Sequence, residues 1–166
     1  MSRTVSFVCV AASFALCVVW NGAYAQTPLT TDAARAVVAP LYDALNQPAK
    51  KDVAALLEKA ASPNWQSCGT NDQCAPRERI IAGIKSRGET IPDLKWEIKE
   101  PIVAGNEVIV RGEASGTPVA PLFDVQPTGK GFKIMSIDIH TIEGGKIVRS
   151  YHIEDWAGAM RQVESK

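Results

Sequence analysis

The sequence predicts an α+β fold in which helices come first and a sheet follows. Between residues 31 and 87 the apolar side chains recur at intervals of three and four, which is the period of an amphipathic helix. From residue 93 onward apolar and polar side chains alternate, which is the period of a half-buried strand. Helices and strands that are segregated along the chain in this way are typical of an α+β domain with an antiparallel sheet.

The first 25 residues have the three parts of a signal peptide. Arg3 is followed by an apolar stretch from Val5 to Trp20, and Ala23-Tyr24-Ala25 is a small-x-small cleavage pattern. A membrane anchor is the alternative, but the stretch is short for a bilayer and serines interrupt it. We therefore expect cleavage before Gln26, a periplasmic or secreted location, and one domain over residues 26–166.

The charge of the remaining chain argues against two classes of partner. Loss of Arg3 leaves 18 − 1 = 17 basic side chains against 18 acidic ones. A chain so nearly neutral has no long-range field that would gather nucleic acid or an anionic membrane surface. We expect no nucleic-acid partner, and no membrane partner after signal cleavage.

Two of the four cysteines, Cys9 and Cys17, lie in the signal peptide. The other two, Cys68 and Cys74, flank a short polar loop, and the oxidising conditions outside the cytoplasm favour a disulfide between them. Closing so short a loop stabilises a chain by about 2 kcal/mol in the loop-entropy account. A redox pair needs closer spacing, and a zinc site needs further ligands that the surrounding sequence does not offer.

Three helices are predicted in the first half of the domain, over residues 31–46, 49–60 and 76–87. Pro40 lies inside the first and predicts either a kink or a late helix start. Pro48 stands at the entrance of the second, where proline is tolerated. The third ends at Gly88, a common residue after the last helical turn.

Four strands are predicted in the second half, and we expect them to form an antiparallel meander. The first begins at Asp93, and the others span residues 107–114, 132–142 and 146–153. A loop rich in proline and glycine occupies residues 116–131, and a last short helix begins near Asp155.

The last two strands separate polar from apolar side chains. Asp138 and His140 share one face of the third strand. A three-residue loop, 143–145, would place Asp138 opposite Ser150 and gather Asp138, His140, Ser150, His152 and Glu154 on one face, whereas a two-residue turn would mix the faces. Clean segregation favours the longer loop, and the polar face then meets either solvent or a cavity.

Short motifs follow one another in a fixed order along the domain: Ile91-Pro92-Asp93-Leu94-Lys95-Trp96, Gly116-Thr117, Pro127-Thr128-Gly129-Lys130, Ile137-Asp138-Ile139-His140, Gly145-Lys146-Ile147-Val148 and Asp155-Trp156. In this order they resemble the SnoaL-like polyketide cyclase (ester cyclase) family of the nuclear transport factor 2-like superfamily. The resemblance implies a cone, in which a curved antiparallel sheet wraps around N-terminal helices and encloses a small-molecule pocket. It also implies, for members that are enzymes, ring closure by an acidic side chain without metal or cofactor.

The resemblance further implies that Asp138 points into the pocket. We expect Asp138, His140 and His152 to act there as the catalytic acid/base group, because imidazole and a buried carboxyl exchange protons near neutral pH. The alternative is a hydrogen-bonded structural pair. Two departures weaken the assignment: His152 stands where cyclases of the family carry an acid, and the helix tyrosine of related isomerases corresponds to Leu41, with Tyr42 one residue away.

Five further side chains are expected to bind the ligand. Trp65, Trp96 and Phe123 would stack on a planar molecule at the pocket mouth, although core packing is the commoner role of such residues. Ser150 and Glu154 lie on the polar face beside the acid/base group. No dense ligand motif supports a metal site, so we expect neither metal nor cofactor.

Two functions remain open on the sequence alone. The first is a cofactor-free proton-transfer enzyme, cyclase-like or isomerase-like, acting on a small apolar carbonyl compound. The second is a non-catalytic module that binds a hydrophobic small molecule in the same cone. Under either, the apolar outer face formed by Ile137, Ile139, Tyr151 and Ile153 predicts a homodimer.

Overall fold

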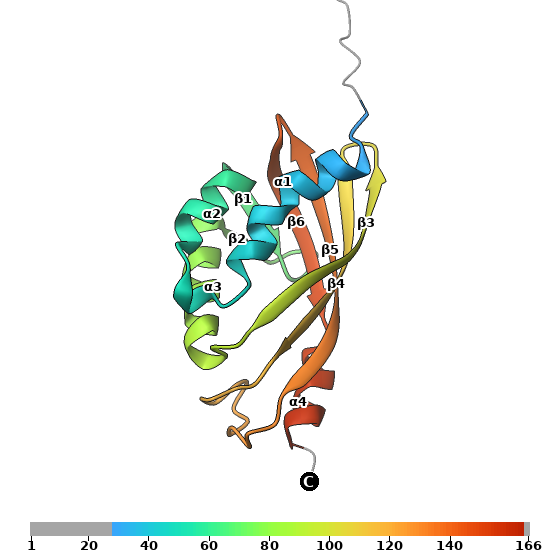
Figure 1. Ribbon diagram of the computed structural model, residues 1–166. Coiled ribbons are helices and arrows are strands. Elements are labelled where there is room, and N and C mark those ends of the chain that lie inside the picture. The colour runs from blue at the N-terminus through green and yellow to red at the C-terminus, as the bar shows by residue number, and fades with distance from the viewer. Residues whose placement is uncertain (1–27, 165–166) are drawn as a thin grey trace, which may run out of the picture.

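Three α-helices precede most of the sheet, as their apolar spacing predicts. The computed structural model describes residues 28–164, so the predicted signal peptide lies outside the described residues. Helix α1 spans Thr31–Ala44, α2 spans Val53–Ala60 and α3 spans Arg77–Thr90, and a short 3₁₀ helix, η1, occupies Pro48–Lys50 (Figure 1). No helix in this part of the chain is long and apolar enough to cross a bilayer.

Side-chain caps set the starts of the first two helices. Thr30 Oγ1 accepts a hydrogen bond from the Ala33 amide at 3.2 Å, and Asp52 Oδ1 accepts one from the Ala55 amide at 3.0 Å. Helix α1 runs through Pro40, so the late helix start is not seen. The second helix begins later than predicted, because Asp52 caps it.

Helix α3 continues past Gly88 to Thr90, so Gly88 does not end the helix as predicted. Glycine is required there for close approach instead: a Cβ atom would lie 2.7 Å from the backbone nitrogen of Ala49. Gly88 therefore lets η1 pack directly against α3.

A six-stranded mixed sheet has the strand order β2-β1-β6-β5-β4-β3. The predicted meander is confirmed as β3 to β6, but β1 and β2 were not predicted, and β1 runs parallel to β6. The β1 sequence contains Pro63 and Asn64 and has no apolar alternation, so its pattern does not indicate a strand. The bounds are β1 Ala61–Cys68, β2 Cys74–Pro76, β3 Lys95–Ala104, β4 Glu107–Gly116, β5 Phe132–Glu143 and β6 Lys146–Glu154.

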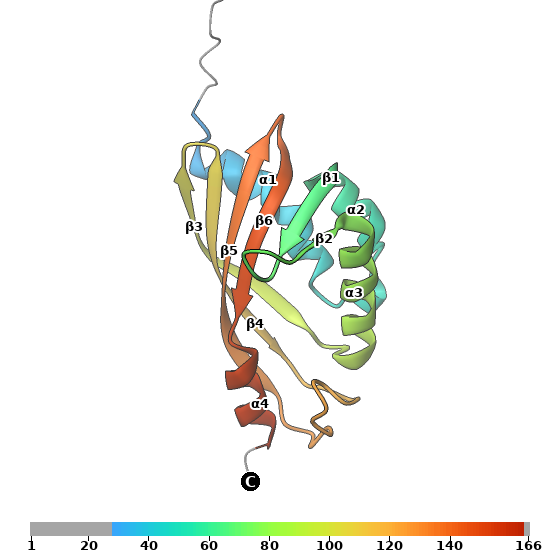
Figure 2. The ribbon, with the colours of Figure 1, turned by 180° about the vertical axis from the view of Figure 1, so that it is seen from behind.

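Helix α4, Trp156–Glu164, closes the described chain beyond the end of β6 (Figure 2). A disulfide joins Cys68 to Cys74 where β1 and β2 pair. The disulfide therefore links the two ends of the polar loop that connects these strands.

The hairpin between β5 and β6 differs from the prediction in its turn and in its register. Glu143 pairs with Lys146, so the turn has two residues, Gly144 and Gly145, and Asp138 lies opposite His152 rather than Ser150. A shift between Thr141 and Ile142 leaves Val148 as an extra residue in β6. This bulge restores the alternation, so the polar side chains still share one face.

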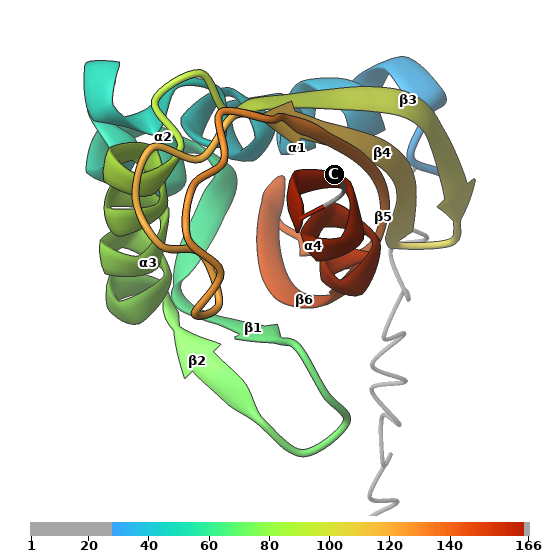
Figure 3. The same cartoon turned by 90° about the horizontal axis from the view of Figure 1, so that it is seen from below.

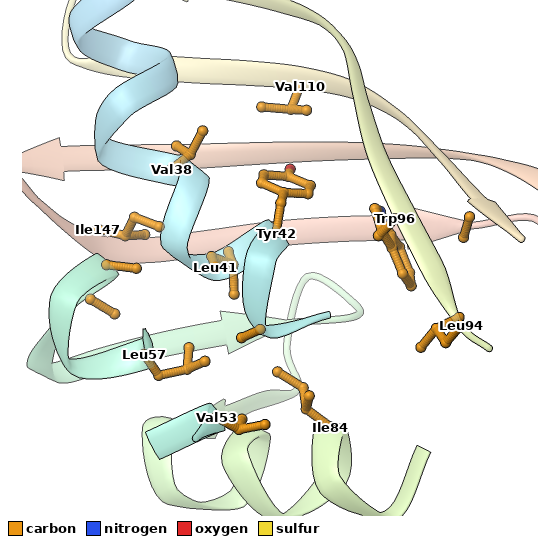
Figure 4. Packing of buried hydrophobic residues seen from close by; sticks show 14 of the residues in the cluster. Val38, Leu41, Tyr42, Val53, Leu57, Ile84, Leu94, Trp96, Val110 and Ile147 are labelled. Carbon is orange, nitrogen blue, oxygen red and sulfur yellow. The ribbon is translucent and has the colours of Figure 1, made fainter. Parts of the chain in front are cut away.

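The sheet is curved, as Figure 3 shows from below for β3, β4 and β5. Helix α1 covers the concave side of the sheet and directs the ring of Tyr42 toward Val110, while Leu41 lies on the side of Leu57 (Figure 4). The bulge also turns Ile147 into the core, where its side chain is fully buried. On the convex side Met135 is 58% exposed and Ile153 is 69% exposed.

Candidate functional site

The concave side of the sheet contains a cavity of about 360 Å³ that opens between α3 and the last two strands. Its size lies within the range of small-molecule pockets. Most of its surface is apolar, and five polar or titratable side chains from β5 and β6 project into it. The lining residues are Leu41, Leu45, Trp65, Ser67, Ala75, Arg79, Ile80, Gly83, Ile84, Arg87, Trp96, Asp138, His140, Ser150, His152, Glu154 and Trp156.

Asp138 of β5 is the buried carboxyl of this cavity. Its Oδ2 accepts a hydrogen bond from the hydroxyl of Tyr42 at 2.9 Å and a longer one from Ser136 Oγ at 3.5 Å. Its Oδ1 makes no hydrogen bond with the described residues and is not among their fully buried unpaired atoms, so it is open to the cavity. Burial raises the pKa of Asp138 to about 6, against the opposing effect of the Tyr42 hydrogen bond.

His140 lies two residues further along β5 and is 1% exposed. Its Nε2 lies 3.1 Å from the Tyr42 hydroxyl, and its Nδ1 lies 2.8 Å from Ser150 Oγ. Burial lowers the pKa of His140 to about 3. The imidazole is therefore neutral at neutral pH and carries one N–H.

The hydrogen bonds around His140 run in one direction. The Tyr42 hydroxyl donates its hydrogen to Asp138, so it accepts from His140 Nε2–H. Nδ1 then accepts from the Ser150 hydroxyl, which in turn accepts from the indole N–H of Trp65 at 2.9 Å. The relay from Trp65 through Ser150, His140 and Tyr42 therefore ends on Asp138.

A second indole supports the same carboxyl from β3. Trp96 Nε1–H donates to Ser136 Oγ at 3.1 Å, and Ser136 Oγ faces Asp138 Oδ2. An indole N–H can only donate. Trp65 and Trp96 thus fix the direction of both relays, and each relay directs a hydrogen toward Asp138 Oδ2.

His152 of β6 is the cross-strand partner of Asp138 and is more exposed than His140. Its Nδ1 lies 2.8 Å from Glu154 Oε1, and Glu154 Oε2 accepts from the indole N–H of Trp156 at 3.2 Å. The hydrogen bond to Glu154 raises the pKa of His152 above its usual value, against partial burial. Glu154 therefore holds the proton on Nδ1 and leaves Nε2 free of hydrogen bonds to the described residues.

The structure brings most of the sequence-predicted site residues together. Asp138, His140, His152, Ser150 and Glu154 all line the cavity. Trp65 and Trp96 line it too, although they are buried and serve as hydrogen-bond donors as well as apolar wall.

Phe123 is the exception, because it does not line the cavity. Its side chain is 54% exposed, and its ring centroid lies 5.5 Å from that of Trp156. Phe123 therefore packs against Trp156 without lining the cavity, and its contact with a ligand stays a prediction.

Tyr42, Arg87 and Trp156 line or support the site and were not predicted to belong to it. Tyr42 lies one position from the expected helix tyrosine, yet it shares a helical stripe with Val38 and Leu45. A tyrosine in an apolar stripe needs a partner for its hydroxyl. That requirement is the signal that points to a polar group on the facing strand.

Residues 28–164 contain no group of three or more His, Cys, Asp or Glu side chains arranged to hold a metal ion. The two histidines of the cavity instead form hydrogen bonds with neighbouring side chains. One neutral histidine is enclosed within the relay, and one partly exposed histidine is paired with a carboxylate.

The family model of SnoaL-like polyketide cyclases matches residues 36–163. The chain belongs to this family. The match runs from within α1 to the end of α4 but for its last residue, and it includes every strand of the sheet and every residue of the cavity. No curated protein matches the chain at a significant level.

Solved structures share the SnoaL-like fold at low sequence identity. TsrD from Streptomyces laurentii is 22% identical, with a TM-score of 0.71 over 83% of this chain and 99% of its own. A candidate SnoaL-like polyketide cyclase from Jannaschia sp. CCS1 is 19% identical, with a TM-score of 0.72 over 85% of this chain and 97% of its own. IdmH, a candidate polyketide cyclase from Streptomyces antibioticus, is 22% identical, with a TM-score of 0.67 over 78% and 96%.

These likenesses confirm the predicted nuclear transport factor 2-like fold class. They concern the fold alone, because a fold of this kind supports many different reactions. The chemistry of this chain has to be argued from its own cavity.

Proposed function

We propose that this SnoaL-like protein is an exported acid/base catalyst that acts without a cofactor on a small, mostly apolar carbonyl compound. The observation that carries the proposal is the state of Asp138: a buried carboxyl whose pKa lies near 6, with one oxygen held by Tyr42 and the other open to the cavity. A general base is most effective when its pKa lies near the working pH.

Asp138 and His152 have complementary parts in this reaction. Asp138 Oδ1 removes a proton from the carbon next to the substrate carbonyl, and the electron pair of the broken C–H bond forms an enolate. His152 is held through Nδ1 by Glu154, and in its protonated form, which Glu154 favours, it donates a hydrogen bond from Nε2 to the oxygen on which charge develops. The enolate carbon then attacks a second carbonyl of the same molecule, and the alkoxide that forms takes the proton from Asp138. In an isomerisation the enolate instead takes that proton at another carbon.

His140 has a positioning role in this proposal. Its low pKa keeps it neutral, so it does not exchange protons with a substrate at neutral pH. Instead it fixes the Tyr42 hydroxyl, and the Tyr42 hydroxyl fixes Asp138. The acid/base pair is therefore Asp138 and His152, which face each other across β5 and β6.

Export and a homodimer complete the proposal. The Cys68–Cys74 disulfide supports an oxidising compartment, in line with the signal-like first 25 residues. The convex face of the sheet exposes Met135 and Ile153, and a second copy of this chain would cover such an apolar surface.

Deuterium exchange tests the catalytic proposal without knowledge of the product. Aryl ketones and diketones are incubated with the protein in D₂O, and loss of the protons next to the carbonyl is followed by NMR. We expect exchange above the buffer rate, and we expect His152→Ala to lower it by about 100-fold or more, the usual contribution of a positioned acid or base. Asp32→Asn, an exposed change in the first turn of α1, is the control that should retain full activity.

A non-catalytic binding module is the second candidate, and the mostly apolar wall of the cavity favours it equally. It predicts that ketones bind without exchange and that His152→Ala retains their affinity. Exchange that His152→Ala and Asp138→Asn leave unchanged would contradict the catalytic proposal.

A further inference from the structure

We propose that the ligand of this cavity carries an anionic oxygen group, a carboxylate or an equivalent oxyanion, which binds the guanidinium of Arg87. The inference rests on the proposed function only in requiring that the cavity binds a small molecule. It adds a chemical class to that molecule: an apolar body with one acidic group at the α3 side of the cavity.

Arg87 reaches the cavity from the last turn of α3. Ile80, Gly83, Ile84 and Arg87 lie at intervals of three and four, so they form the stripe of α3 that lines the cavity. A Cβ atom added at Gly83 would meet nothing within 4 Å. Gly83 therefore leaves open space beside Ile80, Ile84 and Arg87, through which a ligand can approach the guanidinium.

Aromatic rings contact the guanidinium of Arg87, but they provide no hydrogen-bond acceptor for its N–H groups. The Cζ atom of Arg87 lies 4.6 Å from the ring centroid of Trp156 and 5.3 Å from that of Phe123. A cation above an aromatic ring is attracted to the ring face, and the C-terminal end of a helix also favours a cation. Neither interaction supplies an acceptor for the N–H groups, which lie in the plane of the guanidinium.

The N–H groups of Arg87 have no acceptor among the described residues. Nη1 is fully buried without a hydrogen-bond partner, and the side chain forms no ion pair with this part of the chain. Burial lowers the pKa of Arg87, which reports the same loss of solvation. A buried donor without a partner is costly, and that cost is removed when a ligand oxygen accepts from it.

The carboxylates that line the cavity do not pair with Arg87. Two arginines, Arg79 and Arg87, and two carboxylates, Asp138 and Glu154, line it. Glu154 attracts Arg87, but its two oxygens are already used by two N–H donors of its own strand and of α4. An arginine binds a carboxylate through two parallel N–H groups, which a neutral carbonyl compound cannot match.

A matched pair of probes tests this inference by isothermal titration calorimetry at pH 7.5. 2-Naphthoate and 2-naphthamide have the same two-ring body and differ in charge. We expect the wild-type protein to bind the carboxylate about tenfold more tightly or better, the scale of one charge-assisted hydrogen bond. Arg87→Met should remove this preference and retain the affinity for the amide.

Two further variants make the result specific. Lys85→Met removes the same charge from an exposed position of α3 that does not line the cavity, and it should keep the preference for the carboxylate. Arg87→Lys keeps the charge and loses the planar fork, so it should keep only part of the preference. Should Arg87→Met fail to fold, as judged by circular dichroism, Arg87→Lys provides the comparison.

The outcomes separate this inference from the proposed function. If the wild-type protein binds the amide as tightly as the carboxylate, or if both Arg87 variants keep the preference, the inference is wrong while the cavity remains a binding site. If neither probe binds the wild-type protein, the inference and the proposed function are overturned together.

Discussion

Replacement of Asp138 by asparagine should stabilise the protein at pH 8 and have almost no effect on its stability at pH 4. The ionised carboxyl is buried, and burial raises its pKa from 3.8 to about 6 in the folded state. Each tenfold change in proton affinity is worth about 1.4 kcal/mol, so the charge costs the folded protein about 3 kcal/mol at pH 8.

The sign of this dependence follows from the two pKa values of Asp138. Because the folded value is the higher one, the cost is present above pH 6, shrinks as the pH falls from 6 toward 3.8, and is lost below 3.8, where both states bind the proton. Asparagine keeps an oxygen that accepts from Tyr42 and carries no charge at any pH. The lowered pKa of His140 makes both proteins less stable in acid, and it cancels when they are compared at one pH.

Chemical denaturation followed by far-UV circular dichroism, without reductant, measures this effect. Wild-type protein, Asp138→Asn and the exposed control Asp32→Asn are unfolded at pH 8 and at pH 4. We expect Asp138→Asn to exceed the wild-type free energy of unfolding by up to about 3 kcal/mol at pH 8 and to match it within about 0.5 kcal/mol at pH 4. An equal difference at both pH values, or a loss of stability at pH 8, would refute the reasoning.

Three further predictions concern Tyr42, the convex face and the disulfide. Tyr42→Phe should lower the free energy of unfolding by about 1–3 kcal/mol, measured by denaturation at pH 7, because it leaves a buried N–H of His140 unpaired; an unchanged value would contradict the relay. Ile153→Lys should convert the proposed dimer to a monomer in sedimentation at micromolar concentration, and a wild-type protein that is already monomeric would remove that proposal. Cys68→Ser with Cys74→Ser should cost about 2 kcal/mol in the loop-entropy account, and an unchanged thermal midpoint would exclude a stabilising role for the disulfide.

The fold class could be predicted from the sequence because most elements follow simple periods. The alternation along Phe132–Glu143 correctly separates the buried Asp138 and His140 from their partly buried neighbours. Strand β1 was not predicted because its sequence has no alternation of apolar and polar residues; it is held in the sheet by backbone pairing with β6. Long-range pairing of this kind leaves no local signal in a sequence.

The candidate site could be predicted only in part, for two physical reasons. The bulge at Val148 depends on how the hairpin closes, which the sequence pattern does not show. The predicted three-residue loop therefore assigned the polar side chains to the correct face of the sheet but paired Asp138 with the wrong residue of β6. Tyr42 and Arg87 belong to the cavity through contacts with residues about 70 to 100 positions away, namely Asp138 and Trp156. Such distances in the sequence carry no information until the fold brings the segments together.

The one-way relay onto Asp138 has a stereochemical consequence. Because Oδ2 is already occupied by hydroxyl hydrogens, any proton that Asp138 takes from a substrate must sit on Oδ1. In the proposed reaction a single oxygen would reach the substrate from one side of its carbonyl plane, and a proton returned from the same atom would arrive on that same side. A substrate converted in this cavity would therefore give a single enantiomer of the product. Part of that product would retain the hydrogen that Asp138 had removed.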